Sequence, residues 1–461
     1  MKPPRILFWV AALVLVVSVL MPVPIAAAQA KLPAAAPPTA PSSPEPGKAT
    51  QPTPPPAPEK KEVKGYTLPP EKYEQAVAYS RAQYRLYFIN AAYGLLVLLM
   101  LLAVRVPPKF RDWAERASGR RLLQAVIYLP LLLLTLGVLG LPTDIYGHWL
   151  SLKYDQSVQG WGSWFWDWTK GQLIGLIIGT ILLTILFAVI RRSPRRWWFY
   201  FWLASLPILI FLLFITPYVI EPLFFKFEPL EKTQPALVSE IEKVVARGGL
   251  TIPRERMFEM KASEKLKSLN AYVTGFGASK RVVVWDTTLQ KMTPQQILFV
   301  FGHEMGHYVL GHIPKGIAFA AVVLLVFLYL GYRGLHWMLG RWGERWAIRG
   351  EDDWASLLVF LLLLSLFGFL ASPATNTFSR YQEHQADVYG LEVIHGLVPD
   401  SPDVAAEAFQ ILGEIDLADP NPSAFIKIWL YSHPPLNERI VFAQTYDPWS
   451  KGQPPEFVPA Q

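Results

Sequence analysis

The chain contains no cysteine, few charged residues and few histidines. The lack of cysteine excludes disulfides and leaves the redox compartment unreadable from this feature. Charged residues make up only 17% of the 461 positions, whereas hydrophobic residues make up 52% and gather in long runs. A chain of this length could form two or three soluble domains, but this distribution predicts an integral membrane protein.

Seven hydrophobic runs are long enough to cross about 30 Å of hydrocarbon as helices. They cover residues 5–26, 86–104, 122–141, 172–190, 197–216, 315–337 and 354–373. The first run differs, because the basic MKPPR precedes it and the small-residue stretch AAAQA follows it. We therefore expect a signal peptide over residues 1–30, with an uncleaved signal anchor as the alternative. Residues 31–64 are rich in Pro, Ala and Ser, which predicts a disordered spacer.

Basic residues in the loops orient these spans. Three loops are basic and are predicted to be cytoplasmic by the positive-inside rule. Their basic residues are Arg105, Lys109, Arg111, Arg116, Arg120 and Arg121, then Arg191, Arg192, Arg195 and Arg196, and then Arg341, Arg345 and Arg349. Residues 217–314 and the tail from 374 consequently fall on the extracytoplasmic side, in a bacterial inner membrane. The net charge of +7 reflects arginines near anionic lipid and does not indicate nucleic-acid binding.

The stretch FGHEMGHYVLGHIP, residues 301–314, holds three of the eight histidines. On a helix, His303 and His307 stand one turn apart on the same face, where two imidazoles can bind one ion. Glu304 lies beside them. This H-E-x-x-H spacing predicts a Zn²⁺ site with two histidine ligands and Glu304 as the general base, against the alternative of histidines that merely share a helix.

The sequence also indicates where this helix begins and ends. TPQQ, residues 293–296, forms a capping box that begins it. His312 does not extend the motif, because the longer zinc motif needs a histidine at 313, where the chain has Ile313. If the helix continued that far, His312 would lie about 180° from His303. We therefore interpret it as a histidine at the helix end or membrane boundary, not as a ligand.

A catalytic zinc ion takes three protein ligands and keeps one position open, so a third ligand is needed on the same side of the membrane. The helical stretch SRYQEHQADVYGLEVI follows the last span directly. Within it, Glu383 and Asp387 are four residues apart on one face. We expect Glu383 to complete the site and Asp387 to accept a hydrogen bond from a ligand histidine. His384 points about 100° away and is a weaker candidate, and a solvated charged helix is the alternative to any such role.

HEMGH and the later EHQAD, separated by a transmembrane hairpin, together resemble the CAAX prenyl protease 1 and HtpX group of membrane zinc peptidases. Further stretches are similar to the CAAX prenyl protease 1 branch. They are GLPTDIYGHWLSLKYDQS (140–157), EPLFFKFEPL (221–230), SLNAYVTGF (268–276), VVVWDTTL (282–289) and YSHPPLNERI (431–440). The resemblance covers roughly residues 66–445. It implies that His303, His307 and Glu383 hold zinc and that Glu304 is the base.

Three further residues enter mainly through this resemblance. SLNAYVTGF and VVVWDTTL alternate like strands, so they should form a β-hairpin whose edge holds an extended substrate, with Asn270 near the cleft. His433 is expected to donate a hydrogen bond to the oxyanion that forms on the scissile carbonyl. Arg439 is expected either to support that loop or to bind a substrate carboxylate. A turn residue at 270 and a structural histidine at 433 are the plainer alternatives.

The sequence therefore predicts a polytopic α-helical membrane protein, with six or seven transmembrane helices and a zincin-like α+β catalytic domain that includes a β-hairpin. The resemblance implies that the helices enclose a chamber. The expected parts are 1–30 signal peptide, 31–64 spacer, 65–216 transmembrane bundle, 217–314 first catalytic part, 315–373 transmembrane hairpin, 374–450 second catalytic part and 451–461 disordered tail. The predicted activity is that of a zinc metalloendopeptidase with one Zn²⁺ per chain, acting on peptides or proteins, lipid-modified or not, in contact with membrane lipid.

Other functions stay open at this stage. CAAX proteases cut prenylated tails at the cytosolic face, whereas the arginine pattern here places the catalytic side outside the cytoplasm. The chain either cuts other substrates, as an HtpX-like quality-control protease would, or has the reverse orientation. A zinc-binding scaffold without turnover is a further alternative, although it would have no use for Glu304. A transporter is disfavoured, because the spans lack intramembrane charge pairs.

Overall fold

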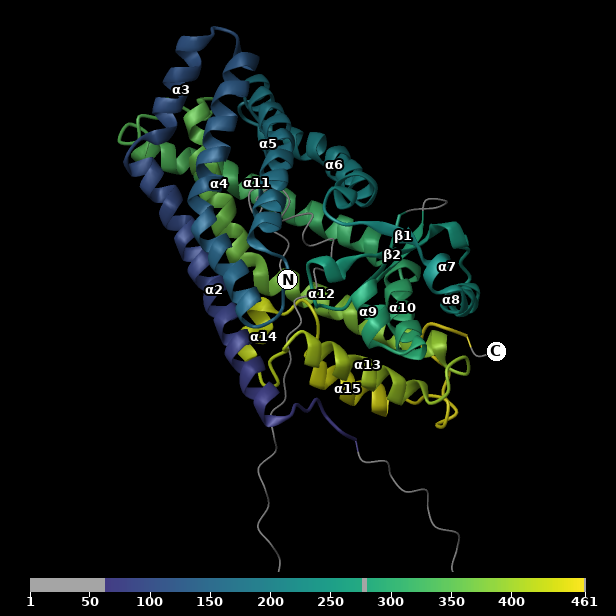
Figure 1. The fold of residues 1–461 in the computed structure, drawn as a ribbon. Coiled ribbons are helices and arrows are strands. Elements are labelled where there is room, and N and C mark those ends of the chain that lie inside the picture. Colours follow the sequence, from purple (N-terminus) through teal and green to yellow (C-terminus); the bar gives the residue numbers. More distant parts are fainter. Residues whose placement is uncertain (1–62, 276–279, 460–461) are drawn as a thin grey trace, which may run out of the picture.

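The computed structural model describes residues 63–275 and 280–459. Six of the described helices are long and apolar enough to cross a membrane, which agrees with the predicted polytopic helical fold. The expected signal peptide and most of the expected spacer lie outside the described residues. Figure 1 shows the long helices gathered into a bundle, with a smaller mixed region of strands and short helices beside one end of it.

The bundle consists of long apolar helices, joined by short connections except between α6 and α11, where residues 216–311 intervene. They are α2 (Pro70–Ala103), α4 (Arg121–Lys153), α5 (Trp161–Arg192), α6 (Trp197–Ile215), α11 (His312–Trp342) and α12 (Leu357–Ile394), with the short α3 (Val106–Ala117) between α2 and α4. Leucines and aromatic residues from these helices form one continuous core, in which Trp197 and Trp354 are fully buried. The first part of α12, residues 357–364, is buried on all sides.

Helix α12 links the bundle to the catalytic region without a break. It runs for 38 residues, or about 57 Å at 1.5 Å per residue. The predicted span and the predicted site helix after it are therefore a single element. Glu383 and Asp387 lie on its later part, beyond the apolar section, so the bundle fixes the position of both carboxylates.

A four-stranded sheet of strand order β1-β2-β4-β3 lies in the mixed region. Its strands are β1 (Phe227–Pro229), β2 (Met257–Met260), β3 (Ala271–Thr274) and β4 (Arg281–Trp285). Strands β3 and β4 pair antiparallel, as the predicted hairpin requires, although the predicted second strand is shorter than expected, because β4 ends at Trp285 and residues 286–291 are helical. Strand β2 pairs with β4 in parallel. β3 is an edge strand, so one side of it has no strand partner within the described residues.

Short helices surround this sheet and complete the catalytic region. They are α7 (Leu230–Thr233), α8 (Pro235–Arg247), α9 (Asp286–Lys291), α10 (Pro294–Val309), α13 (Ser401–Ile415), α14 (Ala424–Leu430) and α15 (Leu436–Thr445). Helix α10 packs against α12, α13 and β3 at once. A second hydrophobic core joins these elements, so the two catalytic parts, separated in sequence by the transmembrane hairpin, fold as one unit.

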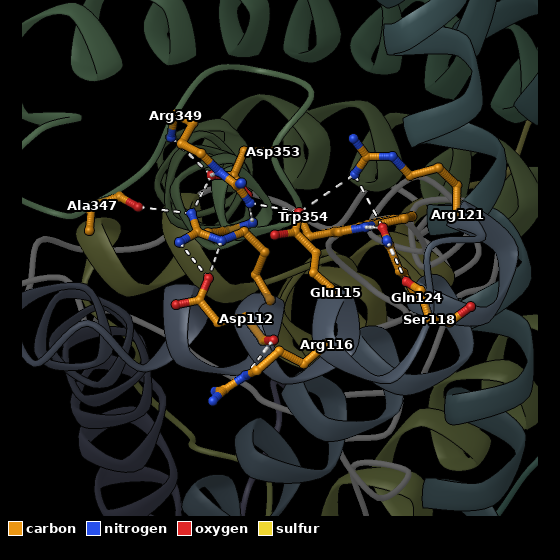
Figure 2. A network of polar contacts seen from close by, with 12 residues as sticks. Asp112, Glu115, Arg116, Ser118, Arg121, Gln124, Ala347, Arg349, Asp353 and Trp354 are labelled. Atoms are coloured by element: carbon orange, nitrogen blue, oxygen red, sulfur yellow. Dashed lines mark hydrogen bonds and ion pairs between the residues drawn. The ribbon is translucent and has the colours of Figure 1, made fainter.

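Two of the three basic loops meet at the other end of the bundle, as Figure 2 shows. Arg111 in α3 donates to Asp353 at 2.6 Å, and Arg349 donates to Glu115 at 2.7 Å. The loop after α5 joins the same end, because the guanidinium of Arg191 lies 4.6 Å from the ring centre of Trp354. The loops predicted to share one side of the membrane are thus brought together.

The end of the chain differs from the disordered tail predicted for 451–461. Glu392, near the end of α12, is buried and accepts the backbone N–H groups of Glu456, Phe457 and Val458 at 2.5, 2.7 and 2.9 Å. The side chain of Val458 is buried as well. A buried carboxylate that receives several hydrogen bonds holds the tail through residue 458, and the composition of the tail did not reveal this partner.

Candidate active site

Helix α10 presents the H-E-x-x-H residues, and its start is fixed as the sequence predicts. The hydroxyl of Thr293 accepts the Gln296 N–H at 3.3 Å, and the Gln296 side chain accepts the Thr293 N–H at 2.9 Å. This capping box begins the helix about three turns before His303. The helix ends at Val309, where Gly311 adopts the left-handed conformation with φ of 68°. The chain then turns directly into the membrane helix α11.

Two glycines allow α10 and α12 to cross at close range. A Cβ added at Gly390 would lie 3.0 Å from the backbone nitrogen of His303, and one added at Gly302 would lie 2.8 Å from Val393 Cγ1. Larger side chains at these positions would push the helices apart. The close crossing brings Glu383, one and a half to two turns before Gly390, to the histidines.

Three side chains converge as metal ligands would. His303 Nε2 lies 3.2 Å from His307 Nε2 and 3.2 Å from Glu383 Oε2, and His307 Nε2 lies 3.6 Å from Glu383 Oε1. Ligands at about 2.05 Å around a tetrahedral zinc ion would be separated by about 3.3 Å. The three donors already hold that spacing, and they are the group among the described residues that could hold a metal ion.

Burial and charge at this cluster also favour a cation. Glu383 is 2% exposed, and its Oε2 receives no hydrogen bond of acceptable geometry from the described residues. Burial opposes a charged His303, but the carboxylates of Asp387 and Glu383 outweigh this effect and raise the pKa of His303 to about 10. A divalent cation would replace that proton and satisfy the orphaned oxygen, so the residues fit a bound metal.

Asp387 and Arg439 lie behind His303. Asp387 Oδ1 is 2.8 Å from His303 Nδ1, as predicted for a carboxylate that fixes the histidine tautomer. Arg439, from α15, donates two hydrogen bonds of 2.5 and 2.9 Å to the same carboxylate. Its guanidinium is buried over the ring of Phe409 at 4.2 Å. Of the two roles expected for Arg439, this placement favours support of the site over contact with a substrate carboxylate.

Glu304 lies on α10 with the two histidines, and His433 approaches the same cluster from the loop before α15. Burial raises the pKa of Glu304 above its ordinary value, which makes it a better proton acceptor. His433 Nε2 lies 3.2 Å from Glu383 Oε2, and its Nδ1 lies 2.9 Å from the Ser432 hydroxyl. Burial lowers the pKa of His433 to about 4, so this imidazole is neutral at pH 7. Because the Glu383 carboxylate that faces Nε2 can only accept, Nε2 carries the ring proton, and Nδ1 is left to accept from the Ser432 hydroxyl.

The remaining candidates lie around the cluster. Asn270 immediately precedes β3 and is tied by its backbone to the Thr288 hydroxyl at 2.8 Å in each direction. It therefore stands at the start of the edge strand that packs on α10. The ring of His384 packs on Phe442 with centres 4.7 Å apart, and it is not one of the converging donors.

One contact was missed by the sequence reasoning. His312 lies at a helix end, as predicted, but its Nδ1 is only 2.9 Å from His307 Nδ1. The angular argument assumed a continuous helix, whereas α10 ends at Val309 and α11 begins at His312, after Gly311 in the left-handed conformation. The glycine immediately before His312 was the available signal for this break.

The fold and the site define a membrane-embedded metallopeptidase. The chain belongs to peptidase family M48, whose family model matches residues 231–447. A second model, described as the CAAX prenyl protease N-terminal region with five membrane helices, matches residues 48–226. These matches confirm the resemblance that the motifs predicted, and with it an integral membrane protein that hydrolyses peptide bonds and uses a metal ion.

Individual relatives agree with this assignment. An uncharacterized metalloprotease of Bacillus subtilis, YhfN, is 36% identical over 388 residues, which cover 83% of this chain and 89% of the relative. A CAAX prenyl protease 1 homolog of Oryza sativa is 28% identical and covers 80% of this chain and 86% of its own. The crystal structure of S. mikatae Ste24p has a TM-score of 0.69 at 24% identity, over 81% of this chain and 88% of that one, and shows the fold.

Proposed function

We propose that the protein is a zinc-dependent endopeptidase in which His303, His307 and Glu383 hold one Zn²⁺. The observation that carries this assignment is the spacing of 3.2 to 3.6 Å among their donor atoms, which matches a tetrahedral zinc site. Nitrogen and carboxylate donors suit zinc, and three of them leave the open position that a catalytic site needs.

The roles of the surrounding residues follow from where they lie. Zinc bound here would supply a Lewis acid that polarises the scissile carbonyl and lowers the pKa of water toward about 7. Glu304 takes the proton of the attacking water and later delivers it to the amine nitrogen when the C–N bond breaks. His433 donates from Nε2 to the oxygen that gains charge. Asp387 and Arg439 hold the ring of His303 in place.

The edge of β3 is the proposed substrate platform. An extended peptide can add to an edge strand through backbone hydrogen bonds, and β3 packs on the helix that carries Glu304. Asn270, which immediately precedes β3, is the residue proposed to contact such a peptide. The rice relative is named as a CAAX prenyl protease 1 homolog. We include lipid-modified peptides and proteins among the proposed substrates, delivered along the membrane.

The first experiment compares the full-length chain with Glu304→Gln in detergent. Both forms should bind about one zinc, and the variant should lose at least about a hundredfold in kcat/KM on a quenched peptide, because it cannot accept the water proton. Glu240→Gln, at an exposed site on α8, is the matched control. Equal cleavage by both forms would remove Glu304 as the base, and a wild-type chain without zinc would refute the proposed site. Paired peptides with and without a prenyl thioether test whether lipid is recognised.

We also propose that the catalytic region faces the extracytoplasmic side of a bacterial inner membrane. Support comes from the three basic loops, which meet at the opposite end of the bundle. The chain has no cysteine, so single cysteines can report topology without a background. In intact cells, a membrane-impermeant maleimide should label Lys232→Cys in the catalytic region and spare Arg195→Cys in a basic loop. The reverse labelling would show the opposite orientation.

A further inference from the structure

We propose that His312 and Gln385 form a hydrogen-bond relay that fixes the tautomer and ring orientation of His307. The inference rests on the proposed metal site, in which His307 is a ligand. Neither residue belongs to the converging donor group. Both would therefore act through His307, as positioning residues.

The break between α10 and α11 creates the first contact of the relay. Gly311, at φ of 68°, separates the two helices, and His312 becomes the first residue of α11. Its ring turns back onto His307, so that the two Nδ1 atoms lie 2.9 Å apart. His312 is 4% exposed, so water does not readily replace this contact. One of the two Nδ1 atoms must carry a proton and the other must accept it.

Gln385 decides which nitrogen carries the proton. His312 Nε2 lies 3.3 Å from Gln385 Oε1, and Gln385 Nε2 donates to the Tyr381 hydroxyl at 3.4 Å. In the structure the amide oxygen therefore faces the histidine and the amide nitrogen faces the tyrosine. Because an amide oxygen can only accept, His312 Nε2 carries the proton of a neutral ring. His312 Nδ1 is then an acceptor.

The direction of the remaining bond follows. His307 Nδ1 must donate to His312 Nδ1, which leaves the lone pair of His307 on Nε2. That atom is the one that faces His303 Nε2 at 3.2 Å and Glu383 Oε1 at 3.6 Å. The relay therefore presents His307 in the form that a metal ion requires, from the side of the ring away from the ligand cluster.

The two ligand histidines thus receive different support from one helix. Asp387 is a carboxylate that holds His303, and Gln385 is an amide that acts on His307 through His312. Both lie on α12 within four residues of Glu383, so a single element supplies a ligand and both orienting partners. The neutral relay adds no charge beside the metal, in contrast to the carboxylate.

The test measures zinc affinity of the purified full-length protein by competition with a chromophoric chelator. His312→Leu removes the acceptor, whereas His312→Asn retains an oxygen near the position of Nδ1. We expect zinc affinity to fall about 10- to 100-fold for leucine and to recover to within about threefold of wild type for asparagine. Gln385→Leu should fall in the same direction, and Gln385→Glu, which keeps an acceptor, should not. The Co²⁺ absorption spectrum should shift only in the two leucine variants.

Each outcome has a defined meaning. Unchanged zinc affinity in His312→Leu overturns the relay, and so does an equal loss in the leucine and asparagine variants, which would indicate packing alone. If His312→Leu does not fold, as judged by thermal unfolding, the Gln385 pair decides the question by the same criteria. A wild-type chain that binds no zinc refutes the proposed function itself, whereas a wild type that binds and cleaves beside an unaffected His312→Leu refutes only the relay.

Discussion

Two buried arginine–aspartate pairs lie at opposite ends of the molecule. Arg111 and Asp353 are 2.6 Å apart, with side chains 8% and 2% exposed, and Arg439 and Asp387 are 2.5 Å apart, with side chains 9% and 1% exposed. The remaining partners of each aspartate differ. Asp353 accepts the backbone N–H groups of Arg349 and Ala355, whereas Asp387 faces the Nδ1 of His303. The same ion pair thus fastens a loop at one end and orients a proposed metal ligand at the other.

This difference shows that the chemistry of a buried pair does not indicate its function. Hydrophobic residues in place of a buried ion pair are often as stabilising, so stability alone does not explain why such a pair is present. The further group that each aspartate contacts, besides its arginine, shows what the pair does. The comparison predicts that the two pairs respond alike in stability and differently in metal binding.

The largest combined effect is expected for Asp387→Asn. Removing the charge leaves Arg439 buried without a full counter-charge and should cost about 3 to 5 kcal/mol of stability. Loss of the carboxylate behind His303 should also weaken zinc binding about 10- to 100-fold. Thermal unfolding and chelator competition in detergent measure the two effects separately. Unchanged zinc affinity would reduce Asp387 to a structural role like that of Asp353.

Asp353→Asn should cost at most a similar amount of stability, up to about 3 to 5 kcal/mol, because Arg111 is equally buried but keeps Asp112 as a second carboxylate at 2.8 Å. Zinc affinity and kcat/KM of the folded fraction should stay at the wild-type values, since this pair lies at the far end of the bundle. Measuring both variants under the same conditions isolates the further group that each aspartate contacts as the variable. A fall in the zinc affinity of Asp353→Asn would contradict the expected difference between the two ion pairs.

Arg439→Lys should have a smaller effect than either aspartate change. Lysine keeps the charge but cannot form the two parallel hydrogen bonds with Asp387 or stack as flatly on Phe409, so we expect a loss of about 1 to 3 kcal/mol. Arg111→Lys is the matched variant and should lose a similar amount. Only the change at 439 should alter zinc affinity, and an equal shift in both would argue for a global effect.

Asp112→Asn should have the smallest effect. Asp112 contacts the same arginine, Arg111, at 2.8 Å, but its side chain is 49% exposed. Solvent screens such a pair, so unfolding should change by no more than about 1 kcal/mol. A larger loss, measured by thermal unfolding beside Asp353→Asn, would show that exposure is a poor guide to these pairs.

The sequence predicted those parts of the site that depend on local spacing. His303, Glu304 and His307 lie on one helix, and Glu383 and Asp387 on another, so helical periodicity could place each set. The five membrane helices other than α2 also begin within about ten residues of the predicted runs, and α2 begins earlier because its first turns are polar. The antiparallel pairing of β3 with β4 was predicted as a hairpin, but the position of β3 at the edge of the sheet was seen only in the structure.

The remaining contacts join residues that are far apart in the chain, and periodicity carries no information about them. Arg439 meets Asp387 across 52 residues, and Arg111 meets Asp353 across 242. The His312 contact is short-range, yet it depends on the break between α10 and α11 at Gly311. Counting 100° per residue through this break places His312 on the wrong side of the helix. Tertiary packing decides each of these positions.

The hydrogen bonds between Glu392 and the C-terminal tail determine where the chain can be truncated or tagged. This carboxylate sits nine residues beyond Glu383 on α12 and receives the N–H groups of residues 456–458. A truncation before Glu456 would strip a buried charge of three donors on the helix that carries the proposed metal ligand. A purification handle or reporter fused at Gln461 starts only three residues past Val458, so a long flexible spacer belongs between them.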